Sequence, residues 1–280
     1  ALGNVVFEKG DLRNINDIEK IFSKYKIDGV IHFAAFALVE ESMKAPSKYY
    51  LNNIYGTINL LDTMLKYGVN KIVFSSTCAT YGEPLYLPID EKHNQNPINP
   101  YGYSKLVVER VMDDYDVAYG LKSVRLRYFN VAGSDEKTRI GEWHEPETHL
   151  IPNIIKSALN NNKTFYIFGD DYNTKDGTCI RDYVNVLDLA EAHRLSYEYL
   201  LSENKTDIFN IGTGSGHSVK EIFDTCELVL NKKISVEIKE RRSGDPAQLY
   251  ADISKIKHIL KWEPKRTLKD SINTNYLWEI

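Results

Sequence analysis

The feature that most constrains the fold is an alternation of apolar and amphipathic segments over about the first 130 residues. Residues 29–35 are almost continuously apolar, and 71–75 and 123–127 resemble strands. Helical spacing marks residues 14–25, with segments 47–66 and 101 onward between the strands. Continuously apolar strands suit a parallel sheet covered on both faces, so we predict a doubly wound α/β sheet. We also expect residues 4–8 to form a strand.

Small or polar residues follow each predicted strand, and ligands of such sheets sit beyond the carboxyl ends of the strands. These residues are Asp11, Ala34, Ala35, Ser75, Ser76, Thr77, Tyr128, Phe129 and Asn130. We therefore expect the functional site at this edge.

Tyr101 and Lys105 are four residues apart at the start of a predicted helix, which places them on one face. An ammonium beside a phenol lowers the phenol pKa, so Tyr101 is a candidate base and Lys105 its activator. The same spacing also arises by chance, as Tyr67 and Lys71 show. The predicted strand ends on either side of Tyr101 nevertheless favour a catalytic role for it. Thr77 is either a hydrogen-bond donor to substrate or a strand-end cap.

The alternation loosens after Gly133, and we expect residues 134–280 to form mainly a smaller substrate-binding lobe, with some segments crossing back. Helices are predicted at 150–159, at 186–200 and, capped by Ser218, through 230, with strands at 165–168 and 208–211. The glycines of 212–216 are out of register for a G-x-G-x-x-G phosphate loop, which favours a structural turn. Arg181 and Arg242 could clamp a phosphate, whereas Asp182 and Asp245 are suited to pairing with arginines.

The chain has 280 residues and a net charge of −4, with no basic stripe, so we expect no nucleic-acid partner. Its apolar runs are too short to span a bilayer and no signal peptide is evident, so no membrane association is expected. Three cysteines without a C-x-x-C pair indicate reduced thiols in a cytoplasmic protein and no metal site.

Ten segments in order resemble the extended short-chain dehydrogenase/reductase family, and within it the UDP-glucose 4-epimerases. They are GDLR (10–13), HFAAFALVEES (32–42), NNIYGT (52–57), FSSTCATYG (74–82), PYGYSK (100–105), LRYFNVAG (126–133), THLIPNI (148–154), FGDDYNTKDGTCIRDYV (168–184), NIGTGSG (210–216) and RRSGDPA (241–247). The resemblance implies a Rossmann-like NAD-binding domain over residues 1–133 and a homodimer.

It also implies roles for individual residues. Thr77, Tyr101 and Lys105 match the catalytic Ser/Thr, Tyr and Lys. The cofactor contacts would come from Asp11, Leu12, Phe33, Ala34, Ala35, Asn52, Tyr101, Lys105 and Phe129. The UDP-sugar contacts would come from Thr77, Tyr101, Asn130, His149, Phe168, Arg181, Arg242 and Asp245.

The implied reaction interconverts UDP-glucose and UDP-galactose. Tyr101 removes the proton of the C4 hydroxyl while hydride passes from C4 to NAD. The 4-keto sugar then rotates and hydride returns to its other face, so NAD stays bound.

Members of the family begin with a strand, a glycine-rich turn, a helix and a second strand, and this sequence starts after them; we therefore expect a fragment. Sugar-nucleotide 4,6-dehydratases are the main alternative, but they carry an Asp-Glu pair where this chain has Cys78 and Ala79. Epimerases of UDP-N-acetylhexosamines or UDP-pentoses remain open, because Leu249 leaves the sugar preference undecided. A further alternative is an inactive sugar-nucleotide-binding fragment.

Overall fold

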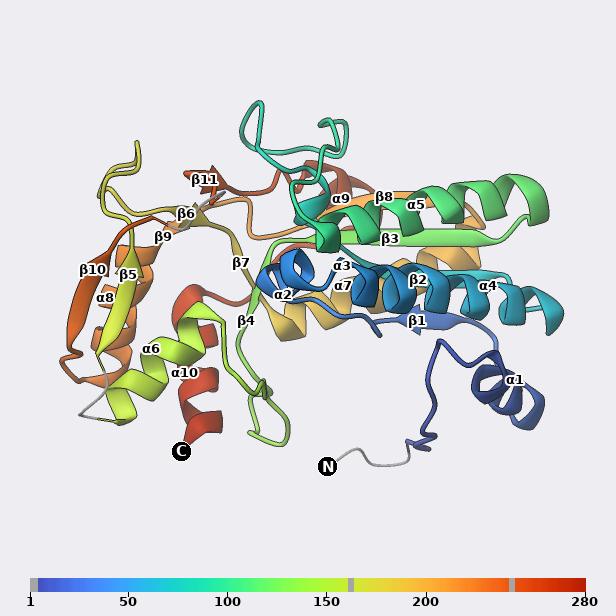
Figure 1. Ribbon diagram of the computed structural model, residues 1–280, viewed down its shortest axis with the longest axis horizontal. Helices are drawn as coiled ribbons and strands as arrows, with labels where there is room; N and C mark the ends of the chain where they lie inside the picture. The colour runs from blue at the N-terminus through green and yellow to red at the C-terminus, as the bar shows by residue number, and fades with distance from the viewer. Residues whose placement is uncertain (1–4, 161–163, 242–244) are drawn as a thin grey trace.

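The computed structural model describes residues 5–160, 164–241 and 245–280. A parallel sheet forms the larger lobe, and smaller sheets with three helices form the second (Figure 1). In spatial order the large sheet contains β1 (Val30–His32), β2 (Lys71–Thr77), β3 (Lys122–Tyr128) and β8 (Asp207–Ile211). All three of its strand pairings are parallel, which confirms the predicted α/β class.

Helices cover both faces of the large sheet. Ile72 and Phe74 of β2 pack with α1 (Ile15–Lys24), α4 (Gly56–Lys66) and α5 (Pro100–Tyr119). Val73 lies on the opposite face and packs with α7 (Val186–Glu203). Successive residues of β2 therefore face different helical layers, which explains why its sequence is apolar without alternation.

The segment predicted as one helix over 47–66 is helical throughout but changes register. The helix α3 (Pro46–Tyr49) leads into the π-helix η1 (Tyr50–Tyr55) and then into α4. A short helix, α2 (Val39–Lys44), precedes it, and the turn η2 (Cys78–Thr80) follows β2. Single π turns of this kind occur frequently at functional sites.

The predicted strand over residues 4–8 is wrong for the described part, because residues 5–10 form no regular element. Val5, Val6 and Phe7 are largely exposed, and Phe7 is 80% exposed. A strand needs a neighbouring strand for its backbone groups, and none of the described strands pairs with this segment.

The smaller lobe has its own apolar core between its helices and its short sheets. Its helices are α6 (Leu150–Leu159), α8 (Val219–Leu230) and α10 (Leu268–Glu279). Its strands are β4 (Asn130–Ala132), β5 (Phe165–Phe168), β6 (Ile180–Arg181), β7 (Tyr183–Asn185), β9 (His217–Ser218), β10 (Val236–Lys239) and β11 (Gln248–Leu249). The helix α9 (Ser254–Leu260) packs against β8 and α7 on the larger lobe.

Candidate active site

The start of α5 fixes the candidate base beside the end of β2. Asn99 caps the helix, its Oδ1 accepting from the Gly102 amide at 2.8 Å, and Pro100 occupies the first helical position. A Cβ at Gly102 would lie 2.5 Å from the Ala79 carbonyl oxygen. Only glycine therefore allows the first turn of α5 to approach the segment that follows Thr77.

Thr77 and Tyr101 meet at this contact. The Thr77 side chain hydrogen-bonds Tyr101, which favours the phenolate, but burial has the larger effect and raises the pKa of Tyr101 above its ordinary value. The buried Lys105 donates from Nζ to the Ser75 carbonyl oxygen at 2.7 Å. The lower Tyr101 pKa expected from the sequence is therefore not found in this arrangement.

Burial also acts on Lys105 itself. Desolvation lowers the pKa of Lys105 to about 7, and the Glu109 carboxylate only partly opposes this. The Phe74 ring centroid lies 4.7 Å from Nζ. Lys105 can therefore change its charge close to neutral pH.

A buried charge network ties α5 to the sheet beneath the site. Glu109 accepts three hydrogen bonds from the Arg127 guanidinium on β3, and Ser76 donates to Glu109 at 2.5 Å. The side chains of Glu109 and Arg127 are 2% and 3% exposed. Sequence analysis did not single out this pair, because its partners lie 18 residues apart on different elements.

A second network starts at the π-helix. Asn53 binds the backbone amide and carbonyl of Phe36 at 2.9 and 3.0 Å, and it donates to Ser104 Oγ at 3.0 Å. It thereby joins the loop after β1 to α5. The asparagine pair at 52 and 53 was the only sequence signal for this link.

Five of the predicted cofactor residues line one cavity of about 740 Å³ at the carboxyl end of β1. These are Asp11, Leu12, Ala34, Ala35 and Asn52. Asp11 binds Arg13 at 2.5 Å, and this contact lowers the pKa of Asp11 to about 2. The small side chains at 34 and 35 leave the space above the strand end open.

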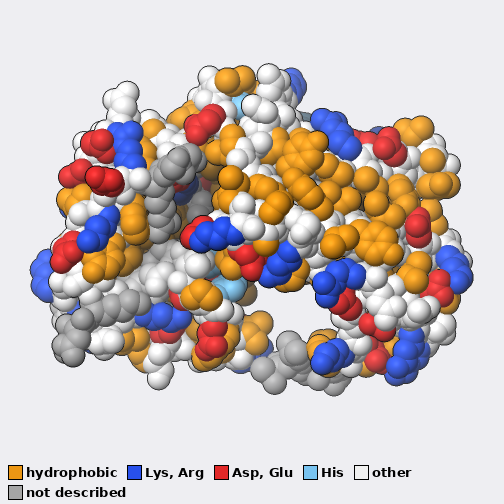
Figure 2. All heavy atoms as spheres, in the orientation of Figure 1, with side chains coloured by type: hydrophobic (Ala, Val, Ile, Leu, Met, Phe, Trp, Pro, Cys, Tyr) orange, Lys and Arg blue, Asp and Glu red, His pale blue; other side chains and the backbone are white. Residues whose placement is uncertain are grey.

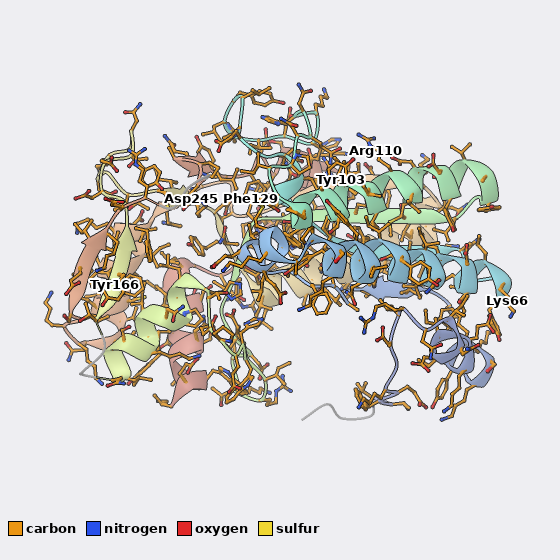
Figure 3. All side chains as sticks on the ribbon, in the orientation of Figure 1. Lys66, Tyr103, Arg110, Phe129, Tyr166 and Asp245 are labelled. Atoms are coloured by element: carbon orange, nitrogen blue, oxygen red, sulfur yellow. The ribbon has the colours of Figure 1, made fainter. Side chains whose placement is uncertain are left out.

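Phe33 and Phe129 do not line that cavity. Phe33 is 56% exposed, with its ring 4.6 Å from the His193 ring. Phe129 is buried in the core behind the sheet, and its amide donates to the Ile211 carbonyl at 3.1 Å. Figure 3 shows Phe129 near the junction of the two lobes.

Five predicted substrate residues line a second cavity of about 600 Å³ in the smaller lobe. They are Asn130, His149, Phe168, Arg181 and Asp245. Sequence analysis missed further lining residues, namely Asn153, Tyr166, Cys179 and Tyr183. Their signal was weak, since single apolar or amide residues on β5, β7 and α6 are equally typical of a core. Figure 3 shows Tyr166 and Asp245 on this lobe, away from Tyr103 and Arg110 on α5.

The arginines at positions 181 and 241 form ion pairs with different partners. Arg181 is an ion-pair partner of Asp245 and donates to the Pro246 carbonyl at 2.7 Å. Arg242 lies outside the described residues. Arg241 forms an ion pair with Asp171 at 2.5 Å.

The pairing predicted for Asp182 is wrong. Its carboxylate accepts from the Thr213 amide at 2.7 Å and from the Gly214 and Ala251 amides at 3.2 Å. A Cβ at Gly212 would lie 2.3 Å from Asp182 Oδ2. The glycine-rich segment 212–216 is therefore a turn wrapped on a buried carboxylate, as the structural alternative predicted.

Comparison with known proteins adds independent evidence. The sequence profile of the family described as GDP-mannose 4,6 dehydratase matches residues 1–274. The UDP-glucose 4-epimerase of Halalkalibacterium halodurans is 52% identical over 265 residues, covering 95% of this chain and 79% of that protein.

Two solved structures agree with this. The NAD complex of the Brucella ovis UDP-glucose 4-epimerase has a TM-score of 0.92 at 44% identity, covering 96% of this chain and 83% of that one. The Bifidobacterium longum UDP-glucose 4-epimerase in complex with NAD⁺ and UDP has a TM-score of 0.90 at 40% identity, covering 96% and 81%.

Proposed function

Because this chain belongs to the UDP-glucose 4-epimerases of the extended short-chain dehydrogenase/reductase family, we propose that it interconverts UDP-glucose and UDP-galactose with NAD as cofactor. The observation that carries the proposal is the contact of Thr77, on the end of β2, with Tyr101 on α5, one turn from the buried Lys105. The residues that follow Thr77 are Cys78 and Ala79, so the acid pair of a dehydratase is missing.

The cavity at the carboxyl end of β1 fits the cofactor. The Ala34 and Ala35 side chains leave room for a dinucleotide, and Asp11, Leu12 and Asn52 offer polar and apolar contacts around it. When bound, NAD supplies a reversible acceptor for the hydride on sugar C4. We place Phe33 and Phe129 at the cofactor by family resemblance, and Tyr101 and Lys105 at its reactive end.

The chain's own residues then handle the proton. The Tyr101 phenolate oxygen accepts the proton of the C4 hydroxyl, which converts it to the phenol, and the phenol later returns that proton to the sugar. Thr77 stabilises the phenolate through its hydrogen bond. A protonated Lys105 one turn away adds positive charge where the phenolate develops, and its pKa of about 7 keeps both forms accessible.

The smaller lobe holds the UDP-sugar in this proposal. Phe168 offers a ring for the uracil, while Arg181 can exchange the Asp245 carboxylate for a diphosphate. Asn130 and His149 complete the lining, and Arg242 is assigned to the diphosphate by resemblance. We propose residues 1–133 as the NAD domain and 134–280 as mainly the substrate lobe, with β8 returning to the larger sheet.

The test is conversion of UDP-galactose to UDP-glucose by the purified chain. We expect Tyr101→Phe to lower kcat by about 10²–10⁴-fold, which is the usual contribution of a general base. Tyr103→Phe is the matched control, because Tyr103 is 50% exposed on the same helix and should retain activity. No turnover by the parent chain would favour the inactive sugar-nucleotide-binding fragment. Equal activity of Tyr101→Phe and an active parent chain would refute the assignment of Tyr101 as the base.

We further propose a cytoplasmic homodimer. Hydrophobic side chains gather over α4 and α5 on the face shown in Figure 2. Exposed hydrophobic residues of η1 and α5 include Leu51, Tyr55 and Tyr119, and an apolar patch of this kind suits a second copy of the chain. The three cysteines are buried and form no disulfide within the described structure, which supports a reducing compartment. No described helix is long and apolar enough to cross a membrane. Light scattering at several concentrations tests the dimer.

A further inference from the structure

Two histidines and two glutamates converge on the loop that precedes α6. Glu142, His144, Glu147 and His149 each offer one ligand atom, and these atoms all lie within 4.8 Å of one another. Glu142 Oε1 is 3.2 Å from His144 Nδ1 and 2.6 Å from His149 Nδ1. Glu147 Oε1 is 3.2 Å from His149 Nδ1. One carboxylate thus contacts both imidazoles.

The fold holds this loop at both ends. The indole of Trp278 on α10 donates to the Glu142 carbonyl oxygen at 2.8 Å. A Cβ at Gly141 would lie 2.3 Å from the same indole, so the close approach requires glycine. At the other end His149 is the N-cap residue of α6. The four side chains are therefore presented by fixed backbone.

Glu147 supplies a second, independent observation. Its side chain is only 6% exposed. Oε1 accepts from the Thr148 and His149 amides at 2.8 and 2.9 Å, whereas Oε2 has no hydrogen-bond partner among the described residues. Lys156 Nζ lies 3.6 Å from Oε2 and His144 Nδ1 lies 4.0 Å from it, and both distances exceed that of a hydrogen bond. A buried carboxylate oxygen without a donor is rare and costly unless a cation reaches it.

We propose that these four residues bind a divalent transition-metal ion of the zinc class. Imidazole nitrogens and carboxylate oxygens bind zinc at about 2.0–2.2 Å, which places neighbouring ligands of a tetrahedral site roughly 3.4 Å apart. Glu142 Oε1 lies 2.6 and 3.2 Å from the two imidazole nitrogens, and Glu147 Oε2 lies 4.0 Å from His144 Nδ1, so these separations bracket that spacing. Two carboxylates neutralise the charge of the ion.

The ion has access, and it would act beside the proposed substrate site. The side chains of His144 and His149 are 46% and 45% exposed, so solvent reaches the cluster. His149 also lines the cavity assigned to the UDP-sugar. The metal site does not depend on the epimerase assignment, because its donors bind the ion whether or not the chain turns over a sugar nucleotide.

The experiment uses the full chain without a histidine tag, stripped of metal by a chelator. Zinc chloride is titrated by calorimetry, and cobalt(II) is titrated by its visible absorption, which distinguishes tetrahedral coordination. We expect one ion per chain. His144→Gln and Glu142→Gln should each weaken zinc binding by at least about tenfold, because each removes a ligand.

His217→Gln is the matched control. His217 on β9 also pairs with a glutamate, Glu221 on α8, at 2.8 Å, and neither residue belongs to the cluster. The control should bind zinc as tightly as the parent chain. Circular dichroism checks that each variant is folded. Absence of stoichiometric binding, or unchanged affinity in folded His144→Gln and Glu142→Gln, would overturn the proposal. So would an equal loss in His217→Gln.

Discussion

At the scale of single residues, the most informative group is the buried ammonium of Lys105. Desolvation lowers its pKa to about 7, well below the ordinary value of 10.5. Between these two values the unfolded chain holds a proton that the folded chain has released. The linkage relation then requires stability to rise with pH across this window.

We therefore expect Lys105→Met to change how steeply the unfolding free energy varies with pH, rather than simply to lower that free energy. We expect the unfolding free energy of the parent chain, relative to Lys105→Met, to rise from pH 7 to pH 10 by at most about 1.4 kcal/mol per pH unit. Urea unfolding at several pH values measures it. Lys20→Met is the control, because it removes a lysine from an exposed position on α1. Parallel curves for the parent and Lys105→Met would show that Lys105 stays protonated when folded.

For single residues, the sequence predicted which side chains share a helix face, but it did not predict their pKa values. The four-residue spacing of Tyr101 and Lys105 predicted a shared helix face, and both lie on α5. The expected fall of the Tyr101 pKa did not appear, because the pKa depends on burial and on where Nζ points. Nζ points to the Ser75 carbonyl, a group 30 residues away that no local pattern reveals.

At the scale of elements, the approach of α5 to β2 decides whether Tyr101 can meet Thr77. Gly102→Ala should raise helix propensity by about 1 kcal/mol, yet the new Cβ would lie 2.5 Å from the Ala79 carbonyl oxygen. Because the backbones at residues 79 and 102 can shift only at a large energetic cost, α5 must move away from the strand end. We expect folded Gly102→Ala to lose at least about tenfold in kcat, because displacements of about 1 Å cost up to about 10²-fold.

The control for this variant is Val117→Ala on the same helix. Val117 is 90% exposed near the far end of α5, so its truncation leaves the first turn in place. Steady-state rates with UDP-galactose, together with melting temperatures, separate displacement from unfolding. Unchanged kcat in Gly102→Ala would show that the contact with Ala79 does not position the base.

The elements that sequence predicted well are those with a strong local period. Helices such as α6 and α8 and the strand β5 lie where their apolar spacing placed them. The strand expected over residues 4–8 failed because strand formation depends on a partner. The π turn η1 was missed because its register change serves the contact of Asn53 with Phe36, which lies 17 residues away.

At the scale of the whole molecule, two lobes share one chain that crosses between them more than once. After the smaller lobe begins, the chain returns to place β8 beside β3. The sequence indicated crossing segments but could not assign them, because a short apolar strand carries no information about its neighbour. The cavity proposed for the UDP-sugar likewise combines residues from β4, α6, β5, β6 and the segment at Asp245.

That assembly predicts how ligand should stabilise the molecule. UDP at about 100 times its Kd should add about 2.7 kcal/mol to the unfolding free energy, which raises the Tm by roughly 5 °C in a chain of this size. Arg181 lies in the cavity and can turn from Asp245 to the diphosphate. At the same UDP concentration, Arg181→Met should therefore lose most of the shift, measured against its own ligand-free Tm.

Arg194→Met is the matched control for this measurement. Arg194 is exposed on α7 and pairs with Glu191 and Glu198, so its removal deletes a guanidinium without touching the cavity. It should keep the full UDP shift, because surface ion pairs contribute little to stability and this one contacts no ligand. An Arg181→Met chain that retains the parent shift would mean that the diphosphate is held elsewhere, and the assignment of the smaller-lobe cavity to UDP would then be wrong.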